Sequence, residues 1–201
     1  MKRIFVLVCL LALAATAFAA DPNTALDAAK LDTQLQVNAT AHTALYFKLQ
    51  TSAQAKACPI TGHAATPDYT MAFGNVDGLG LSANACTNNF AVAGGQMWTT
   101  NYAYIARFAG FASVATTKLE ATLTAPNPTG FALYEGPQTA VGAGVGLNPL
   151  SNSSATAVGG VITSSTTPVD RTIGLLVQDG IAVPAAGLNY SATVTFTLTP
   201  Q

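Results

Sequence analysis

The chain has 201 residues, of which 50% are apolar and only 8% are charged. This length leaves room for one ordinary domain, and the high apolar content excludes an intrinsically disordered chain. The 9 acidic residues outnumber the 8 basic ones, and no basic cluster follows the first residues. The composition therefore excludes a basic nucleic-acid-binding surface.

The first 20 residues have the three parts of a secretory signal peptide. Lys2 and Arg3 form a basic start, residues 4–15 form an apolar core, and Ala17 and Ala19 form an A-x-A cleavage site. The apolar core is short for a membrane span, and later apolar stretches are soon interrupted. We predict a signal peptide at 1–19 and no transmembrane segment in the mature chain. The product would be exported to the periplasm, the outer cell surface or the medium.

A polar stretch at 20–30 precedes the first alternating segment. Only 23–30 looks helical, and we interpret 20–30 as a flexible N-terminal arm. The side chains of Leu31, Leu35 and Val37 then share one face of a predicted strand. This strand is either the first strand of the domain itself or an assembly strand that pairs with the sheet edge of a neighbouring subunit.

Period-two alternation of apolar and polar residues dominates the rest of the chain and predicts half-buried antiparallel strands. In the last segment the side chains of Tyr190, Val194, Phe196 and Leu198 fall on one face. The other predicted strands cover 44–49, 69–73, 98–108, 118–125, 131–134, 158–162 and 173–178. The Gly-, Ser- and Thr-rich stretch at 136–167 is expected to form long, mobile loops around one weak strand.

These strands predict an all-β fold. We expect an antiparallel, immunoglobulin-like or jelly-roll-like β-sandwich of about 8–10 strands, because short strands separated by turn residues are typical of sandwiches. The sandwich would form a single domain over 31–201.

Removal of the signal peptide would leave two cysteines, Cys58 and Cys86, which are 28 positions apart. A cysteine pair in an exported chain predicts a disulfide. Closing a loop of this size would stabilise the fold by about 3 to 4 kcal/mol. The alternative of a metal or redox pair lacks a C-x-x-C motif and has only His63 nearby.

Motifs for catalysis are missing from the sequence. His42 and His63 lack metal-ligand spacing, and there is no G-x-S-x-G nucleophile motif. The acidic residues form no recognisable catalytic pair, and we interpret them as turn and rim residues. They are Asp68, Asp77, Glu120, Glu135, Asp170 and Asp179. We therefore predict no catalytic residue, no metal site and no cofactor.

Three aromatic residues, Trp98, Tyr102 and Tyr104, share one strand face. They could form a ligand-stacking platform for sugar rings. Alternatively they pack in the core, which a shared strand face in a sandwich favours.

Three segments carry a resemblance to a known group of proteins. FGNVDGLG at 73–80, WTTNYAYIARFAGF at 98–111 and the closing GLNYSATVTFTLTP resemble segments of small exported bacterial β-sandwich proteins of the cell surface. The closing strand, and Cys58 followed by Phe73 and Gly74, are loosely similar to pilus and spore-coat type fibre subunits. This resemblance implies assembly by strand exchange, with copies of the chain or another surface subunit as partners.

The low charge supports the same expectation, because soluble domains usually contain about 25% charged residues. A surface of Thr, Asn, Ser, Ala and Gly is suited to packing against other subunits. We expect an exported structural or adhesive cell-surface protein without enzymatic activity. A secreted carbohydrate-binding module with glycan partners is the alternative, and a hydrolase is the third interpretation.

Overall fold

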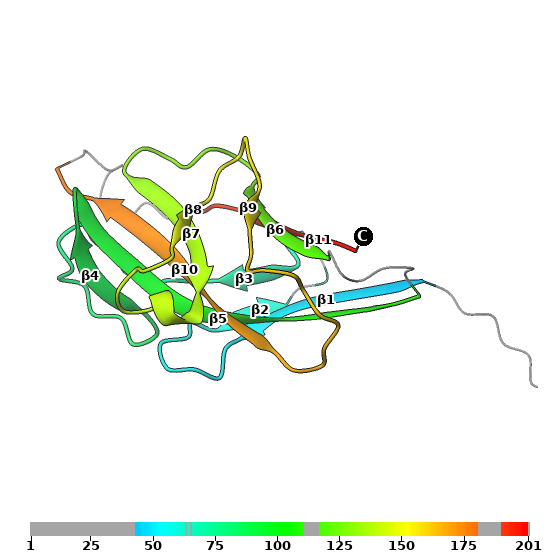
Figure 1. Cartoon of the computed structure of the whole chain (residues 1–201). Coiled ribbons are helices and arrows are strands. Elements are labelled where there is room, and N and C mark those ends of the chain that lie inside the picture. Colours follow the sequence, from blue (N-terminus) through cyan, green and yellow to red (C-terminus); the bar gives the residue numbers. More distant parts are fainter. Residues whose placement is uncertain (1–42, 63, 65, 111–116, 181–189, 201) are drawn as a thin grey trace, which may run out of the picture. The chain divides into compact units, whose positions relative to one another are not determined.

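A computed structural model describes residues 43–62, 64, 66–110, 117–180 and 190–200 (Figure 1). The chain divides into two compact units, 1–40 and 41–201, and all of the described residues belong to the second. The signal peptide, the arm and the predicted strand with Leu31, Leu35 and Val37 lie outside the described residues, as do His42 and His63. None of the helical structure in the described ranges is long and apolar enough to cross a membrane.

The described residues form eleven strands and one short 3-10 helix. In chain order these are β1 (Ala44–Thr51), β2 (Ile60–Gly62), β3 (Tyr69–Met71), β4 (Asn88–Val92), β5 (Gly95–Ala109), β6 (Lys118–Leu123), β7 (Phe131–Pro137), η1 (Gln138–Ala140), β8 (Asn148–Pro149), β9 (Thr156–Ala157), β10 (Val169–Gln178) and β11 (Val194–Thr199).

The strands form two main sheets and a hairpin. A six-stranded sheet has the order β1-β5-β10-β7-β8, with β4 also paired to β5, and a three-stranded sheet has the order β11-β6-β9. Strands β2 and β3 form the separate hairpin. All neighbouring strands are antiparallel. The prediction of an all-β, sandwich-like antiparallel fold is confirmed.

The core lies between the six-stranded and the three-stranded sheets. Strand β6 contributes Leu119, Ala121 and Leu123, whose exposed fractions are 2%, 0% and 3%. On β11, the ring of Phe196 lies 6.2 Å from that of Phe47 on β1 and 5.8 Å from that of Tyr102 on β5. These contacts place β11 over the β1 side of the large sheet.

The other face of the large sheet is covered as well. Thr99 and Asn101 on β5 and Thr172 on β10 are fully buried, although alternation predicted one solvated face. The segment after β7 covers them: the carbonyl of Gln138 accepts a hydrogen bond from the Thr172 hydroxyl, and that of Val141 accepts one from the Asn88 side chain. Central strands therefore have two buried faces.

The segment 136–167 is more than the long loops that its composition predicted. It contains the end of β7, η1, β8 and β9, and it buries Ala140, Leu150, Val158 and Ile162. The strand predicted at 158–162 is wrong, because the regular strand is β9. The backbone amides of Val158 and Ile162 instead donate to carbonyls beside or within β6. Glycines at 159 and 160 separate these two contacts.

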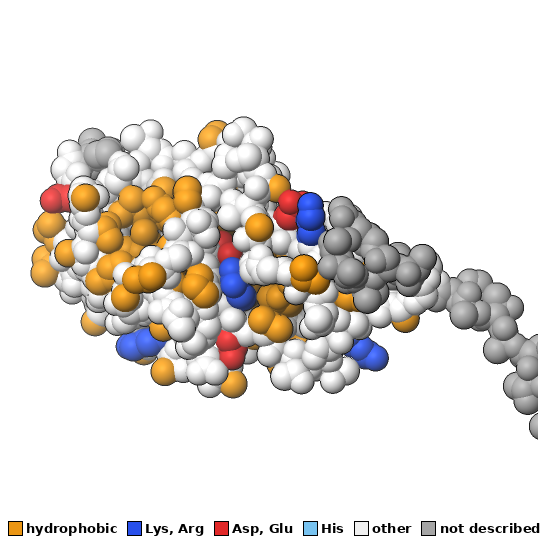
Figure 2. Space-filling view, in the orientation of Figure 1, with side chains coloured by type: hydrophobic (Ala, Val, Ile, Leu, Met, Phe, Trp, Pro, Cys, Tyr) orange, Lys and Arg blue, Asp and Glu red, His pale blue; other side chains and the backbone are white. Residues whose placement is uncertain are grey.

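Charged side chains are sparse on the surface (Figure 2). In this view most of the surface is white, and hydrophobic side chains gather over the region of β4 and β10. The low charge of the sequence is therefore visible on this face of the folded protein.

The packing of the core predicts that truncating two paired leucines will lower the free energy of unfolding by different amounts. Leu119 on β6 and Leu198 on β11 are opposite each other, but Leu119 is buried and Leu198 is half-buried. Leu119→Ala should lower the free energy of unfolding by about 2 to 5 kcal/mol, and Leu198→Ala by about half as much. Urea unfolding of the two variants measures the difference. Equal losses would show that β11 is as deeply packed as β6.

Candidate functional site

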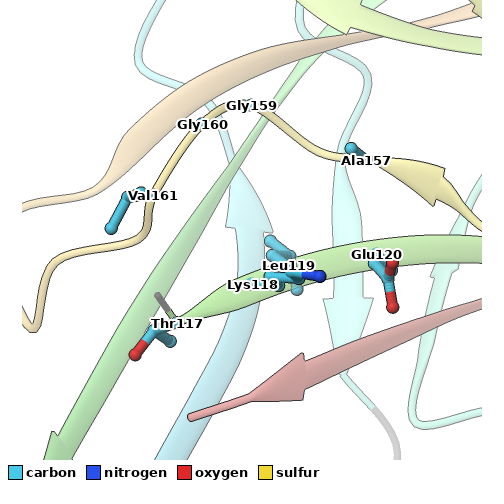
Figure 3. Close-up of a pocket in the computed structure, with 8 residues that line it drawn as sticks. All are labelled: Thr117, Lys118, Leu119, Glu120, Ala157, Gly159, Gly160 and Val161. Atoms are coloured by element: carbon cyan, nitrogen blue, oxygen red, sulfur yellow. The ribbon is translucent and has the colours of Figure 1, made fainter. Parts of the chain in front are cut away.

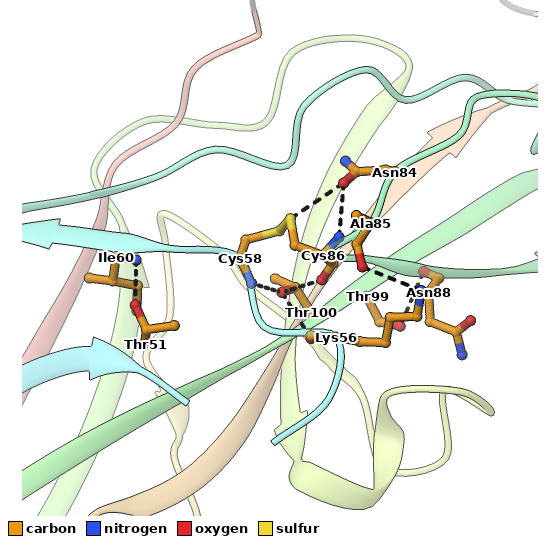
Figure 4. Close-up of a disulfide and its surroundings, with 10 residues drawn as sticks. All are labelled: Thr51, Lys56, Cys58, Ile60, Asn84, Ala85, Cys86, Asn88, Thr99 and Thr100. Carbon is orange, nitrogen blue, oxygen red and sulfur yellow. Dashed lines mark hydrogen bonds between the residues drawn. A yellow bond between two sulfur atoms is a disulfide. The ribbon is translucent and has the colours of Figure 1, made fainter. Parts of the chain in front are cut away.

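The predicted disulfide between Cys58 and Cys86 is confirmed, with a Cα–Cα distance of 4.7 Å (Figure 4). The Thr100 hydroxyl of β5 accepts a 2.8 Å hydrogen bond from the Cys58 amide and lies 3.1 Å from the Cys86 carbonyl. Cys58 is fully buried. The disulfide is therefore held between its own loops and β5. This position is typical of a structural crosslink.

The disulfide lies where β5 changes partners along one edge. Strand β4 pairs with β5 up to Thr99, and β1 pairs with it from Tyr102 onward. Between them, the Asn101 amide donates a 2.7 Å hydrogen bond to the carbonyl of Lys56, two residues before Cys58. Because a buried amide needs a partner, the crosslinked loop completes the pairing of β5 at this gap.

The smaller sheet has an open edge along β11. Within the described residues, β11 pairs only with β6. Its core-facing residues Val194, Phe196 and Leu198 are only half-buried, whereas their neighbours on β6 are at most 3% exposed. An edge strand with a half-covered apolar face lacks a neighbour that would complete the layer.

The large sheet is also incompletely covered on this side. Leu45, Phe47 and Leu49 of β1 point toward the core, and the Phe47 ring contacts Phe196. Leu45 remains 51% exposed. We call the β1 and β11 edges with these apolar side chains the open flank of the sandwich. Within the described residues, β1 pairs only with β5 and β11 only with β6, so each has one edge without a strand partner beside these apolar side chains.

The three candidate stacking aromatics point into the core. Trp98, Tyr102 and Tyr104 are 2%, 1% and 3% exposed. The Trp98 indole N–H donates a 2.8 Å hydrogen bond to the Asp77 carbonyl, and the Tyr104 ring packs at 5.9 Å from that of Phe47. None of these rings offers a free face to a sugar, and their burial matches the core-packing alternative.

A buried polar network crosses three strands at the centre of the core. Glu135 on β7 is completely buried and accepts two 2.8 Å hydrogen bonds from Nε and Nη2 of Arg171 on β10. The Tyr102 hydroxyl donates a third hydrogen bond, of 3.0 Å, to the same carboxylate. The interpretation of Glu135 as a rim or turn residue is wrong. The predicted strand ended one residue before Glu135, at 134, so the sequence contained no clear signal of its burial.

The network is structural because its polar atoms satisfy one another. Burial raises the pKa of Tyr102 well above its ordinary value, and the negative charge of Glu135 raises it further. Burial lowers the pKa of Arg171, but the hydrogen bonds and charge of Glu135 outweigh this, so the pKa is raised. Tyr102 is therefore a neutral donor and Arg171 a cation across the physiological range. Neither group is poised for proton transfer near neutral pH.

Asp77 organises the loop between β3 and β4. Its carboxylate accepts hydrogen bonds from the backbone amides of Leu79, Leu81 and Ser82. Partial burial raises the pKa of Asp77, but the hydrogen bonds outweigh this effect and lower the pKa to about 2. This fixed loop holds the side chains of Leu79 and Leu81 in solvent, where they are 64% and 81% exposed. Asp77 is thus a turn residue, in agreement with its interpretation from the sequence.

A shallow groove of about 290 Å³ lies between β6 and the segment 157–161 (Figure 3). Strand β9 pairs with β6. The chain after β9 moves away from β6 at Gly159 and Gly160 and contacts the chain at the start of β6 again at Ile162. Lys118 and Glu120 are the charged residues of the groove, and the rest of its lining is small or apolar. It contains no nucleophile beside a general base. Groups of three or more metal-ligating side chains are absent from the described ranges.

Comparisons with protein-family models, curated proteins and solved structures found no match for this chain. The open flank, the buried network and the surface are therefore the features of this chain that bear on its function.

The buried network predicts that a single substitution will destabilise the protein more than a double substitution that removes both charges. Glu135→Gln should lower the free energy of unfolding by about 3 to 5 kcal/mol, because it leaves the Arg171 charge buried without its counterion. Replacing both residues, Glu135→Leu with Arg171→Met, should recover most of this loss, because no buried charge remains. Urea unfolding measures both variants. A Glu135→Gln protein as stable as the parent would contradict the assigned role.

Proposed function

We propose that the protein is an exported structural or adhesive cell-surface subunit that assembles with copies of itself through β-strand pairing. The open flank is the observation that carries this proposal. It combines an edge strand, β11, with half-buried apolar side chains on β11 and a half-exposed Leu45 on β1. Strand addition uses these two features, because backbone hydrogen bonds supply affinity and alternate side chains enter an apolar groove.

The chain also contains a segment suited to be the added strand. Leu31, Leu35 and Val37 alternate with polar residues, upstream of the first described strand. Inserted beside β11 of a neighbouring subunit, this face would place apolar side chains over the half-buried Phe196. Such a head-to-tail contact does not close on itself, so it would propagate into a fibre.

The surface composition supports a role in assembly. With 8% charged residues, subunits can approach each other without strong repulsion. Three acidic residues of the core and loops have structural partners: Glu135 binds Arg171, Asp77 binds backbone amides, and Asp170 binds Ser52 and Gln54. These three carboxylates contribute to holding the fold.

Removal of the donor segment tests the proposal. The mature protein without Asp21 to Gln36 should remain folded and monomeric, whereas the complete mature protein should form filaments visible by electron microscopy. A more specific pair of variants leaves the length of the chain unchanged. Replacing Leu31, Leu35 and Val37 with Ser should abolish filaments, and replacing Gln34, Gln36 and Asn38 with Ser should leave them unchanged, because only the first face enters the groove.

Two results would overturn the proposal. A complete mature protein that stays monomeric at high concentration would exclude self-assembly. A shortened protein that unfolds would show that 31–39 is a strand of its own domain rather than a donor.

A further inference from the structure

We propose that the outer face of the β1–β5 ribbon binds an acidic polysaccharide. The site consists of Tyr46 and Lys48 on β1 and of Ile105 and Arg107 on β5, which we call the basic strip. Tyr46 is directly opposite Arg107, and Lys48 is directly opposite Ile105. Side chains of opposite residues lie on the same face, so these four form one contiguous surface. It is the face opposite to Phe47 and the open flank.

Two basic side chains of the strip are free. Lys48, Lys56, Arg107, Lys118 and Arg171 are the basic residues of the described chain, and Arg171 is neutralised by Glu135. Neither Lys48 nor Arg107 forms an ion pair within that part of the chain. Asp170 lies one pair further along the same face and accepts hydrogen bonds from Ser52 and Gln54, which are neutral and leave its negative charge in place. Lys48 and Arg107 outnumber this carboxylate, so the face carries a net positive charge that attracts an anion.

Tyr46 gives the strip an aromatic surface between these charges. Its side chain is 47% exposed, in contrast to the buried Trp98, Tyr102 and Tyr104. A ring exposed on a sheet can pack against the apolar face of a pyranose, while neighbouring polar groups bind its substituents. The ring and the charges together favour a sugar that carries carboxylates.

A polar hollow continues the strip beyond Arg107. It is lined by Arg107, Ser164, Ser165 and Thr166. The segment is fixed against β5, because Ser165 donates its amide to the Ala106 carbonyl and the Ser164 hydroxyl binds the backbone of Phe108. A guanidinium beside hydroxyl groups can bind a carboxylate and its neighbouring sugar hydroxyls.

The shape of the face favours a polymer over other anions. Strands β1 and β5 run side by side over the eight residue pairs from Ala44 to Thr51 (Figure 1). An extended chain of acidic sugars can follow this ribbon from Lys48 across Tyr46 to the hollow. A membrane surface would require apolar side chains that insert between lipids, and Ile105 is half-buried in the sheet.

Binding of polygalacturonate to the mature protein tests this inference, with its methyl-esterified form as the uncharged control. The acidic polymer should bind, the ester should not, and added salt should weaken binding because the charges are exposed. Arg107→Gln and Tyr46→Ala should each raise the Kd about tenfold, as expected for the loss of one charge-assisted or aromatic contact. Lys118→Gln makes the same charge change on the other sheet and should alter the Kd by less than about twofold.

Several results would overturn the inference. Equal binding of the polymer and its ester would exclude a role for the carboxylates. An equal loss of affinity in Lys118→Gln and Arg107→Gln would show that binding is non-specific electrostatic attraction. Binding to phosphatidylglycerol vesicles without binding to polygalacturonate would assign the strip to membranes. The melting temperatures should match in all variants, since the substituted side chains are at the surface, and filament formation is scored separately.

Discussion

The long strand β5 is buried on both faces from Gln96 to Tyr104, so its backbone groups there must find partners along both edges. Strand β10 pairs along one edge, and β4 and then β1 pair along the other. At the change of partner the Lys56 carbonyl binds the Asn101 amide, and the disulfide holds this loop against Thr100. The crosslink thus maintains the continuity of the central sheet, which positions every other element.

The same arrangement explains why one side of the sandwich is closed and the other is open. Around β6 the core residues are buried, and the charges of the buried Tyr102–Glu135–Arg171 network compensate each other. Toward β1 and β11 the two sheets end, and their apolar side chains are only half covered. Within the described residues, these edges and their half-covered side chains are the features on which the proposed strand addition rests.

The sequence was sufficient for most of the longer strands and for the disulfide, since alternation and cysteine count are local or compositional signals, but it missed β4 and the two-residue strands β8 and β9. It could not predict the open flank, because strand order decides which strand lies at an edge. The pairing of Glu135 with Arg171 was also hidden, since the residues are 36 positions apart and meet through β-sheet register. The segment 138–167 is largely irregular, as expected, but the burial of Ala140 within it was not predicted, because small side chains give little hydrophobic signal.

The exchange of β11 backbone amides with deuterated solvent tests the open flank most directly. Strand β11 pairs with β6 on one side only, so alternate amides of 194–199 face outward. We predict that these outward amides exchange rapidly in the monomer that lacks Asp21 to Gln36 and become protected in filaments of the complete mature protein. Protection that is already complete in the shortened monomer, or rapid exchange that persists in filaments, would contradict the account.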